Sequence, residues 1–184
     1  GALTLDEFVA YAEVGSPDEW KRYNFAHLKP TFDRTGGTLQ QLCDDKEFLP
    51  SDLARARAEA LLDGYVNSYY RSLKNARDAN LLASGLDAAE SVTHLVALAF
   101  TAERRVPPYN KFLAWELAGH PLRGDWWPRS EPTQGLLDIV RSGDLDLQAS
   151  HFLRVEEQAR ELGYGGVLDA WGQGSLRALR AGRI

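Results

Sequence analysis

Four polar residues, spaced for one face of a helix, are the first candidates for chemistry in this chain. Asn67, Arg71, Lys74 and Asp78 fall at positions i, i+4, i+7 and i+11, a spacing that puts their side chains on the same face. Arginine and lysine match the oxygens of phosphate groups. The stripe therefore predicts a lining for an anionic ligand, and a charged helix face that contacts only water has the same pattern.

A second group of polar and aromatic residues follows the Pro-Pro pair at 107 and 108. It contains Tyr109, Lys111, Trp115 and Glu116 among apolar residues. A cation beside aromatic rings and a carboxylate is also suited to binding a charged ligand. We treat this segment as the second candidate part of a site.

The elements that must position these residues are helices. Apolar residues recur every three or four positions, and no long segment alternates with the period of a strand. The expected helices span about 52–78, 81–104, 109–118, 133–141, 144–162 and 167–171. The prediction is an all-α fold, an antiparallel (up-and-down) bundle of about five main helices with short extra helices. Residues 1–172 should form one helical domain, and 173–184, rich in Gly and Arg, a flexible C-terminal tail.

Composition limits the classes of function. The chain has 184 residues and a net charge of -5, which argues against duplex nucleic acid as a partner because that contact needs a broad basic surface. A single cysteine, Cys43, rules out an internal disulfide and is expected in a reducing cytoplasm. We find no apolar run of 18 residues and expect no membrane span. The start at Gly1 has neither Met nor a leader, and we expect a segment cut from a longer protein.

Four segments resemble the C-terminal helical half of bacterial nucleotidyltransferase-domain proteins. That family belongs to the DNA polymerase beta-like superfamily, with the aminoglycoside and lincosamide nucleotidyltransferases. The likeness runs in order over about 5–172. The segments are 69–74 with Arg77 and Asp78, 86–92, 108–113 with 115–117, and 169–172.

The resemblance implies a missing partner domain. In such proteins an N-terminal domain carries a Gly-Ser turn and paired Asp residues that bind magnesium and the triphosphate. Here Gly15-Ser16 lacks the following Asp pair, and Asp144-Leu145-Asp146 lacks the preceding Gly-Ser. We therefore expect no metal ligand in this chain and an N-terminal nucleotidyltransferase domain as its partner. The complete enzyme should use Mg2+ and ATP or another NTP, and should act on a small-molecule acceptor. The catalytic residues stay unknown, and the location is expected to be cytoplasmic.

The resemblance also implies roles for single residues. Lys74 would contact the triphosphate with help from Arg71 or Arg77, and Tyr109 with Lys111 would make a second phosphate contact. We expect these side chains to converge on one concave, electropositive surface. The residues expected to orient them or to face the acceptor are Asn67, Asp78, Glu90, Trp115 and Glu116. A plainer alternative for Lys74 is a helix salt bridge with Asp78.

A different class of function starts from Arg22 and His27. An arginine close before a histidine resembles the signature of helical ribonucleases of the HEPN group. The alternative is therefore a stand-alone HEPN-like module, either a ribonuclease toxin or a binding subunit. The spacing is common by chance, and a purely structural histidine explains it as well.

Overall fold

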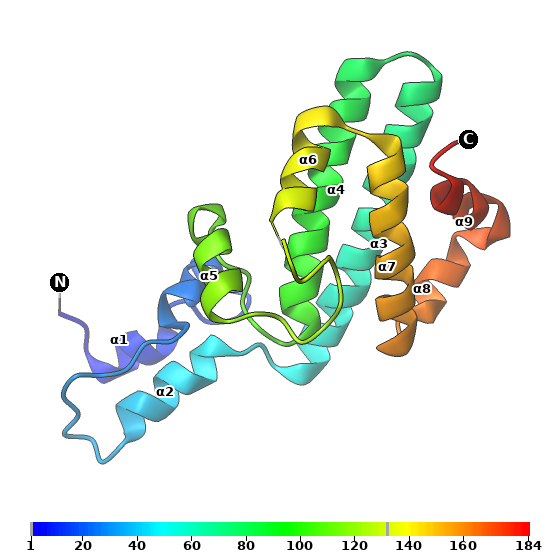
Figure 1. Cartoon of the computed structure of the whole chain (residues 1–184). Helices are drawn as coiled ribbons and strands as arrows, with labels where there is room; N and C mark the ends of the chain where they lie inside the picture. Colours follow the sequence, from blue (N-terminus) through cyan, green and yellow to red (C-terminus); the bar gives the residue numbers. More distant parts are fainter. Residues whose placement is uncertain (1, 132) are drawn as a thin grey trace.

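The computed structural model describes residues 2–131 and 133–184, and this part of the chain is helical, with no strand (Figure 1). The all-α prediction is confirmed. The elements are α1 (Leu5–Ala10), the 3₁₀ helix η1 (Glu19–Phe25), α2 (Thr38–Glu47), α3 (Ser51–Arg77), α4 (Leu81–Ala102), the 3₁₀ helix η2 (Asn110–Phe112), α5 (Leu113–Gly119), α6 (Gln134–Ser142), α7 (Leu145–Glu161), α8 (Gly165–Ala170) and α9 (Gly172–Ala181).

Two long antiparallel helices, α3 and α4, form the centre of the fold (Figure 1). Both were predicted to within two residues at each end. Residues Leu62, Tyr69 and Leu73 of α3 and Leu95 of α4 recur at helical spacing and are almost fully buried. Burial of one stripe on each helix supplies most of the stability of such a hairpin.

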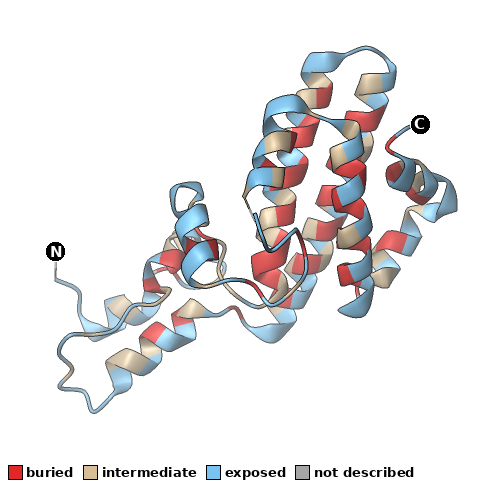
Figure 2. Cartoon of the chain, viewed as in Figure 1, coloured by how far each residue is buried: buried red, intermediate tan, exposed pale blue. Residues whose placement is uncertain are grey.

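Helices α6 and α7 cover one side of the hairpin, and the buried residues of these four helices lie mostly where the helices face one another (Figure 2). Phe152 of α7 and Ile139 of α6 reach the same core as Tyr65 and Leu98. The opposite side of the α3–α4 pair keeps several exposed polar residues, as shown below.

The C-terminal segment corrects one prediction. Residues 173–184 were expected to be a flexible tail, but most of them belong to α9. Leu176 and Leu179 are fully buried, and the Tyr69 hydroxyl donates a hydrogen bond of 2.9 Å to the Leu179 carbonyl. Gly182, in the left-handed conformation, ends the helix. The prediction followed the Gly and Arg content of the segment and overlooked Leu176 and Leu179, whose i, i+3 spacing is typical of a buried helix face.

Helices α1, η1 and α2 form a smaller unit at the lower left of Figure 1, beside α5. This amino-terminal unit, residues 4–48, has its own small core of Ala12, Phe25 and Cys43. Backbone pairing joins it to the end of α4, where the Leu49 N–H donates to the Arg104 carbonyl at 2.7 Å. Residues 2–131 and 133–184 therefore form two hydrophobic clusters of unequal size.

Helix α4 also corrects the expectation that no segment is apolar enough to span a membrane. Helix α4 has 22 residues, and an 18-residue stretch of it has a mean hydropathy of 1.2, so by length and composition it could cross a membrane. In this structure it packs along α3 and α6, and a buried core helix of a soluble protein gives the same signal. In this structure 39% of the apolar stretch is buried against neighbouring helices.

Candidate functional site

A hydrogen-bonded polar cluster bridges α3 and α4 on the side that α6 and α7 leave open. The Arg71 side chain donates from Nε to Asp87 Oδ1 at 2.9 Å, and from Nη2 to both Asp87 and Glu90. We call this group the α3–α4 polar cluster. Its members are Ser68, Arg71, Asn75, Asp87, Glu90 and His94.

The antiparallel pairing of the two helices explains why these six residues meet. Ser68, Arg71 and Asn75 stand at i, i+3 and i+7 of α3, and the other three have the same spacing in α4. Residues at this spacing share one helix face. Consequently Asn75 donates to Asp87 at 2.7 Å, while Ser68, two turns away, reaches Glu90 at 3.0 Å.

Arg71 is fixed in the cluster but keeps unused donors. A guanidinium carries five N–H groups. Three of them point to Asp87 and Glu90, and the hydrogen bond with Asp87 raises the pKa of Arg71. The two N–H groups at Nη1 have no partner among the described residues. The side chains of Arg71 and Glu90 stay 44% and 45% exposed. The Arg71 side chain is therefore partly open to solvent, and the described residues leave two of its N–H groups unused.

The structure brings only part of the expected phosphate site together. Asn67 and Lys74 are exposed on α3, one turn to either side of Arg71, so three predicted residues share one surface. Arg77 lies at the end of α3, where its guanidinium pairs with the neighbouring Asp78 carboxylate at 2.8 Å. Both side chains are therefore engaged in a contact between neighbouring residues.

Tyr109 and Lys111 lie far from Lys74, so the expected convergence is wrong. Arg57, 17 residues before Lys74, is about 25 Å away from it along α3 at 1.5 Å per residue. Arg57 contacts Glu19 of η1. Trp20, which follows Glu19, packs against Tyr109 with ring centroids 6.0 Å apart, so Tyr109 lies near Arg57 and not near Lys74. The turn between α3 and α4 and the segment holding η2 are at opposite ends of the hairpin (Figure 1).

Glu116, expected to face an acceptor, is buried at the centre of a second group of hydrogen-bonded residues. It accepts hydrogen bonds from the Tyr23 hydroxyl at 2.6 Å, from His27 Nε2 at 3.0 Å and from Arg105. Burial by itself would raise the pKa of Glu116, but the three donors outweigh it and the pKa is lowered. Trp115 is 57% exposed and lies edge-on to the His27 ring.

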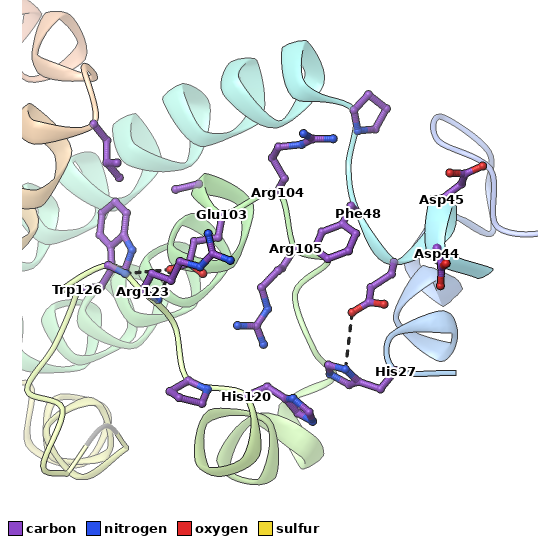
Figure 3. Close-up of a pocket in the computed structure, with 16 residues that line it drawn as sticks. His27, Asp44, Asp45, Phe48, Glu103, Arg104, Arg105, His120, Arg123 and Trp126 are labelled. Atoms are coloured by element: carbon purple, nitrogen blue, oxygen red, sulfur yellow. Dashed lines mark hydrogen bonds and ion pairs between the residues drawn. The ribbon is translucent and has the colours of Figure 1, made fainter. Parts of the chain in front are cut away.

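A cleft of about 1060 Å³ opens beside Glu116, between the amino-terminal unit and the end of α4 (Figure 3). Arg104, Arg105 and Arg123 line it together with His27 and His120. The two imidazole rings are stacked at 3.7 Å with 14° between their planes. Four carboxylates line the same cleft, so its wall offers acceptors as well as donors; they are Asp44, Asp45, Glu47 and Glu103.

Arg22, the other residue of the ribonuclease hypothesis, has a structural position. It is 3% exposed, and its guanidinium donates to the backbone carbonyls of Ala12, Asp45 and Phe48 at 2.9–3.3 Å. These bonds hold α2 against the segment before η1. Arg22 does not line the cleft that contains His27.

Sequence reasoning missed His94, Ser68, Asp87, Arg105 and His120. The available signal was the repeat of polar residues at i, i+3 and i+7 within the apolar helix α4, at 87, 90 and 94. No pattern in the sequence joins position 27 to positions 105, 116 and 120, because that contact depends on how η1 docks on α5.

The described residues contain no group of three or more His, Cys, Asp or Glu side chains arranged to hold a metal. Asp87 and Glu90 both contact the Arg71 guanidinium, which lies between the two carboxylates. These residues do not fit a magnesium ion. Searches against protein-family models, curated proteins and solved structures found no match to this chain.

Proposed function

We propose that this chain is the helical half of a nucleotidyltransferase, which closes over the nucleotide and the acceptor. In this proposal a separate N-terminal domain binds Mg2+ and ATP or another NTP, and the complete, cytoplasmic enzyme transfers a nucleoside monophosphate to a small-molecule acceptor. The single observation that supports it best is the fixed guanidinium of Arg71, with its Nη1 edge free on an exposed face.

The chemistry of the transfer suits such a group. Negative charge is spread over the phosphoryl oxygens in the transition state, so positioned cations stabilise it without covalent chemistry. Asp87 and Glu90 hold Arg71 in place before any ligand binds, and a preorganised donor needs little rearrangement when charge develops. Lys74 and Asn67, on the same face, extend the polar surface by one turn in each direction.

The test pairs this chain with the nucleotidyltransferase domain of its own complete protein and measures pyrophosphate release from NTPs with a panel of hydroxyl-bearing acceptors. Arg71→Lys keeps a charge but cannot hold two carboxylates in the planar geometry of a guanidinium. We expect its turnover to fall about tenfold or more, which corresponds to a charged hydrogen bond of about 1.5–3 kcal/mol. Arg141→Ala, at an exposed position on α6, is the matched control. Absence of transfer in every combination, or normal turnover of Arg71→Lys, contradicts the proposal.

The cleft favours a second candidate, a stand-alone HEPN-like module. The observation behind it is the stacked pair His27 and His120 next to Arg105 and Arg123, since histidines can act as acid and base in RNA cleavage. The test is incubation of the chain alone with single-stranded RNA. Cleavage that disappears in both His27→Ala and His120→Ala would favour the ribonuclease form of this candidate, and intact RNA would exclude that form.

A further inference from the structure

His94 lies at the edge of the α3–α4 polar cluster, with its ring flat over Gly64. A Cβ atom added to Gly64 would lie 3.0–3.1 Å from Nε2, Cδ2 and Cε1 of the ring. Nearly equal distances to three ring atoms mean that the ring presents its face to α3. The lone-pair direction of Nε2, which lies in the ring plane, is therefore not aimed at the Gly64 backbone.

The hydrogen bonds of Ser68 decide which ring nitrogen carries the proton. Ser68 Oγ is 3.0 Å from Glu90 Oε2 and 3.3 Å from His94 Nδ1. A carboxylate only accepts hydrogen bonds, and a hydroxyl has a single hydrogen to donate. The Ser68 hydrogen therefore goes to Glu90, and His94 Nδ1 must donate to Ser68 Oγ.

A neutral imidazole that carries its proton on Nδ1 has a lone pair on Nε2. His94 Nε2 has no partner among the described residues and is not one of their buried, unpartnered atoms. The lone pair consequently meets solvent on the same face as Arg71. Glu90 Oε2 connects the two residues, because it accepts from both Ser68 and Arg71.

We propose that His94 accepts the proton of the acceptor hydroxyl during nucleotidyl transfer, an inference that rests on the proposed function. The hydroxyl oxygen forms a bond to the α-phosphorus of the nucleoside triphosphate, and the bond from that phosphorus to pyrophosphate breaks. The hydroxyl proton moves to Nε2 of His94 and is later released to water. Ser68 and Glu90 are positioning residues, which hold the tautomer that leaves Nε2 free.

The tautomer is tested on this chain without any substrate. Ring-nitrogen chemical shifts from ¹⁵N NMR at neutral pH should show His94 protonated at Nδ1 and unprotonated at Nε2. The Ser68→Ala variant should lose this preference, because Nδ1 then has no acceptor. Thr93→Ala, at the exposed neighbouring position, should keep the wild-type spectrum. A His94 ring protonated at Nε2 in the wild-type chain overturns the proposal.

The catalytic role is tested in the complete transferase. His94→Ala should lower kcat by about 10²–10⁴-fold, the usual contribution of general acid–base catalysis. The KM for the nucleotide should change little, and added imidazole should restore part of the rate. Thr93→Ala should retain wild-type turnover. Normal kcat in His94→Ala overturns the role of His94 and leaves the proposed function standing, whereas absence of transfer by the wild-type enzyme overturns both.

Discussion

Replacing Glu116 by alanine tests whether one buried carboxylate fastens the amino-terminal unit to the rest of the chain. The Glu116 side chain is 2% exposed and accepts hydrogen bonds from Tyr23, His27 and Arg105. The substitution leaves three donors without their acceptor. Breaking a buried ion pair by removing one partner costs about 3–5 kcal/mol. We expect a loss of that size in the free energy of unfolding of the amino-terminal unit, a large share of the stability of an ordinary domain.

The assay combines urea unfolding with amide hydrogen exchange. Tyr23 and His27 belong to the amino-terminal unit, whose own core is small. Exchange should therefore accelerate mainly in residues 4–48, while the buried parts of α3 and α4 keep their protection. Glu157→Ala, on an exposed position of α7, should change stability by no more than about 0.5 kcal/mol. A loss below about 1 kcal/mol for Glu116→Ala, or uniform exchange over the whole chain, would refute the reasoning.

The same carboxylate gives a pH dependence with a defined sign. The folded pKa of Glu116 lies below its ordinary value of 4.5. Its ionisation therefore contributes stability that is fully present above pH 4.5 and is lost as the pH falls through the folded pKa. Glu116→Gln should flatten the unfolding free energy in that window. An unchanged acid limb in the variant would show that other carboxylates dominate.

Three further predictions concern single buried contacts. Gly64→Ala should destabilise the wild-type chain, because the new Cβ would meet the His94 ring at 3.0 Å. When His94 is also replaced by alanine, the same substitution should stabilise the chain by up to about 1 kcal/mol through its higher helix propensity. Urea unfolding measures both changes. Leu176→Ala should cost about 2–5 kcal/mol because the side chain is fully buried in α9, and Arg177→Ala, its exposed neighbour, should be nearly neutral in the same thermal melts. Burial lowers the pKa of His151 below its ordinary value of 6.5. Near and below pH 6.5 the unfolded chain therefore binds more protons than the folded chain. The free energy of unfolding should fall as the pH drops from 7.5 to 5.5, by at most about 1.4 kcal/mol per pH unit. His151→Phe should remove that slope in denaturation measured across the same pH range.

The long helices could be predicted from the sequence because their apolar spacing is regular over more than twenty residues. Leu62, Tyr65, Tyr69 and Leu73 of α3 continue one buried stripe, and such a repeat defines a helix and its inner face. Gly85 does not interrupt α4, which is continuous from Leu81 to Ala102. The glycine only lowers helix propensity by about 1 kcal/mol relative to alanine.

The partners of polar side chains could not be predicted in the same way. The spacing placed Arg71 and Lys74 correctly on one face, but it carries no information on which residue of α4 stands opposite. Asp87 and Glu90 became the partners of Arg71 through the register of the α3–α4 pair. The register depends on side-chain packing along the whole hairpin, including the hydrogen bond of 3.0 Å from Ser72 to the Ser84 carbonyl.

The expected single phosphate pocket fails because its residues lie at opposite ends of the α3–α4 hairpin, where two separate polar groups form. In each group an arginine is paired with a carboxylate: Arg71 with Asp87 and Glu90, and Arg105, which precedes the second candidate segment, with Glu116. The Glu90 side chain is 45% exposed and that of Glu116 is 2% exposed, so the two carboxylates affect stability differently. Contacts of the exposed cluster compete with water and contribute little to stability, and under the proposed function they hold Arg71 in place for a ligand. The contact around Glu116 is buried, and its loss is costly. Substitutions at Glu116 should therefore appear first in unfolding experiments, whereas those at Arg71 should appear first in turnover.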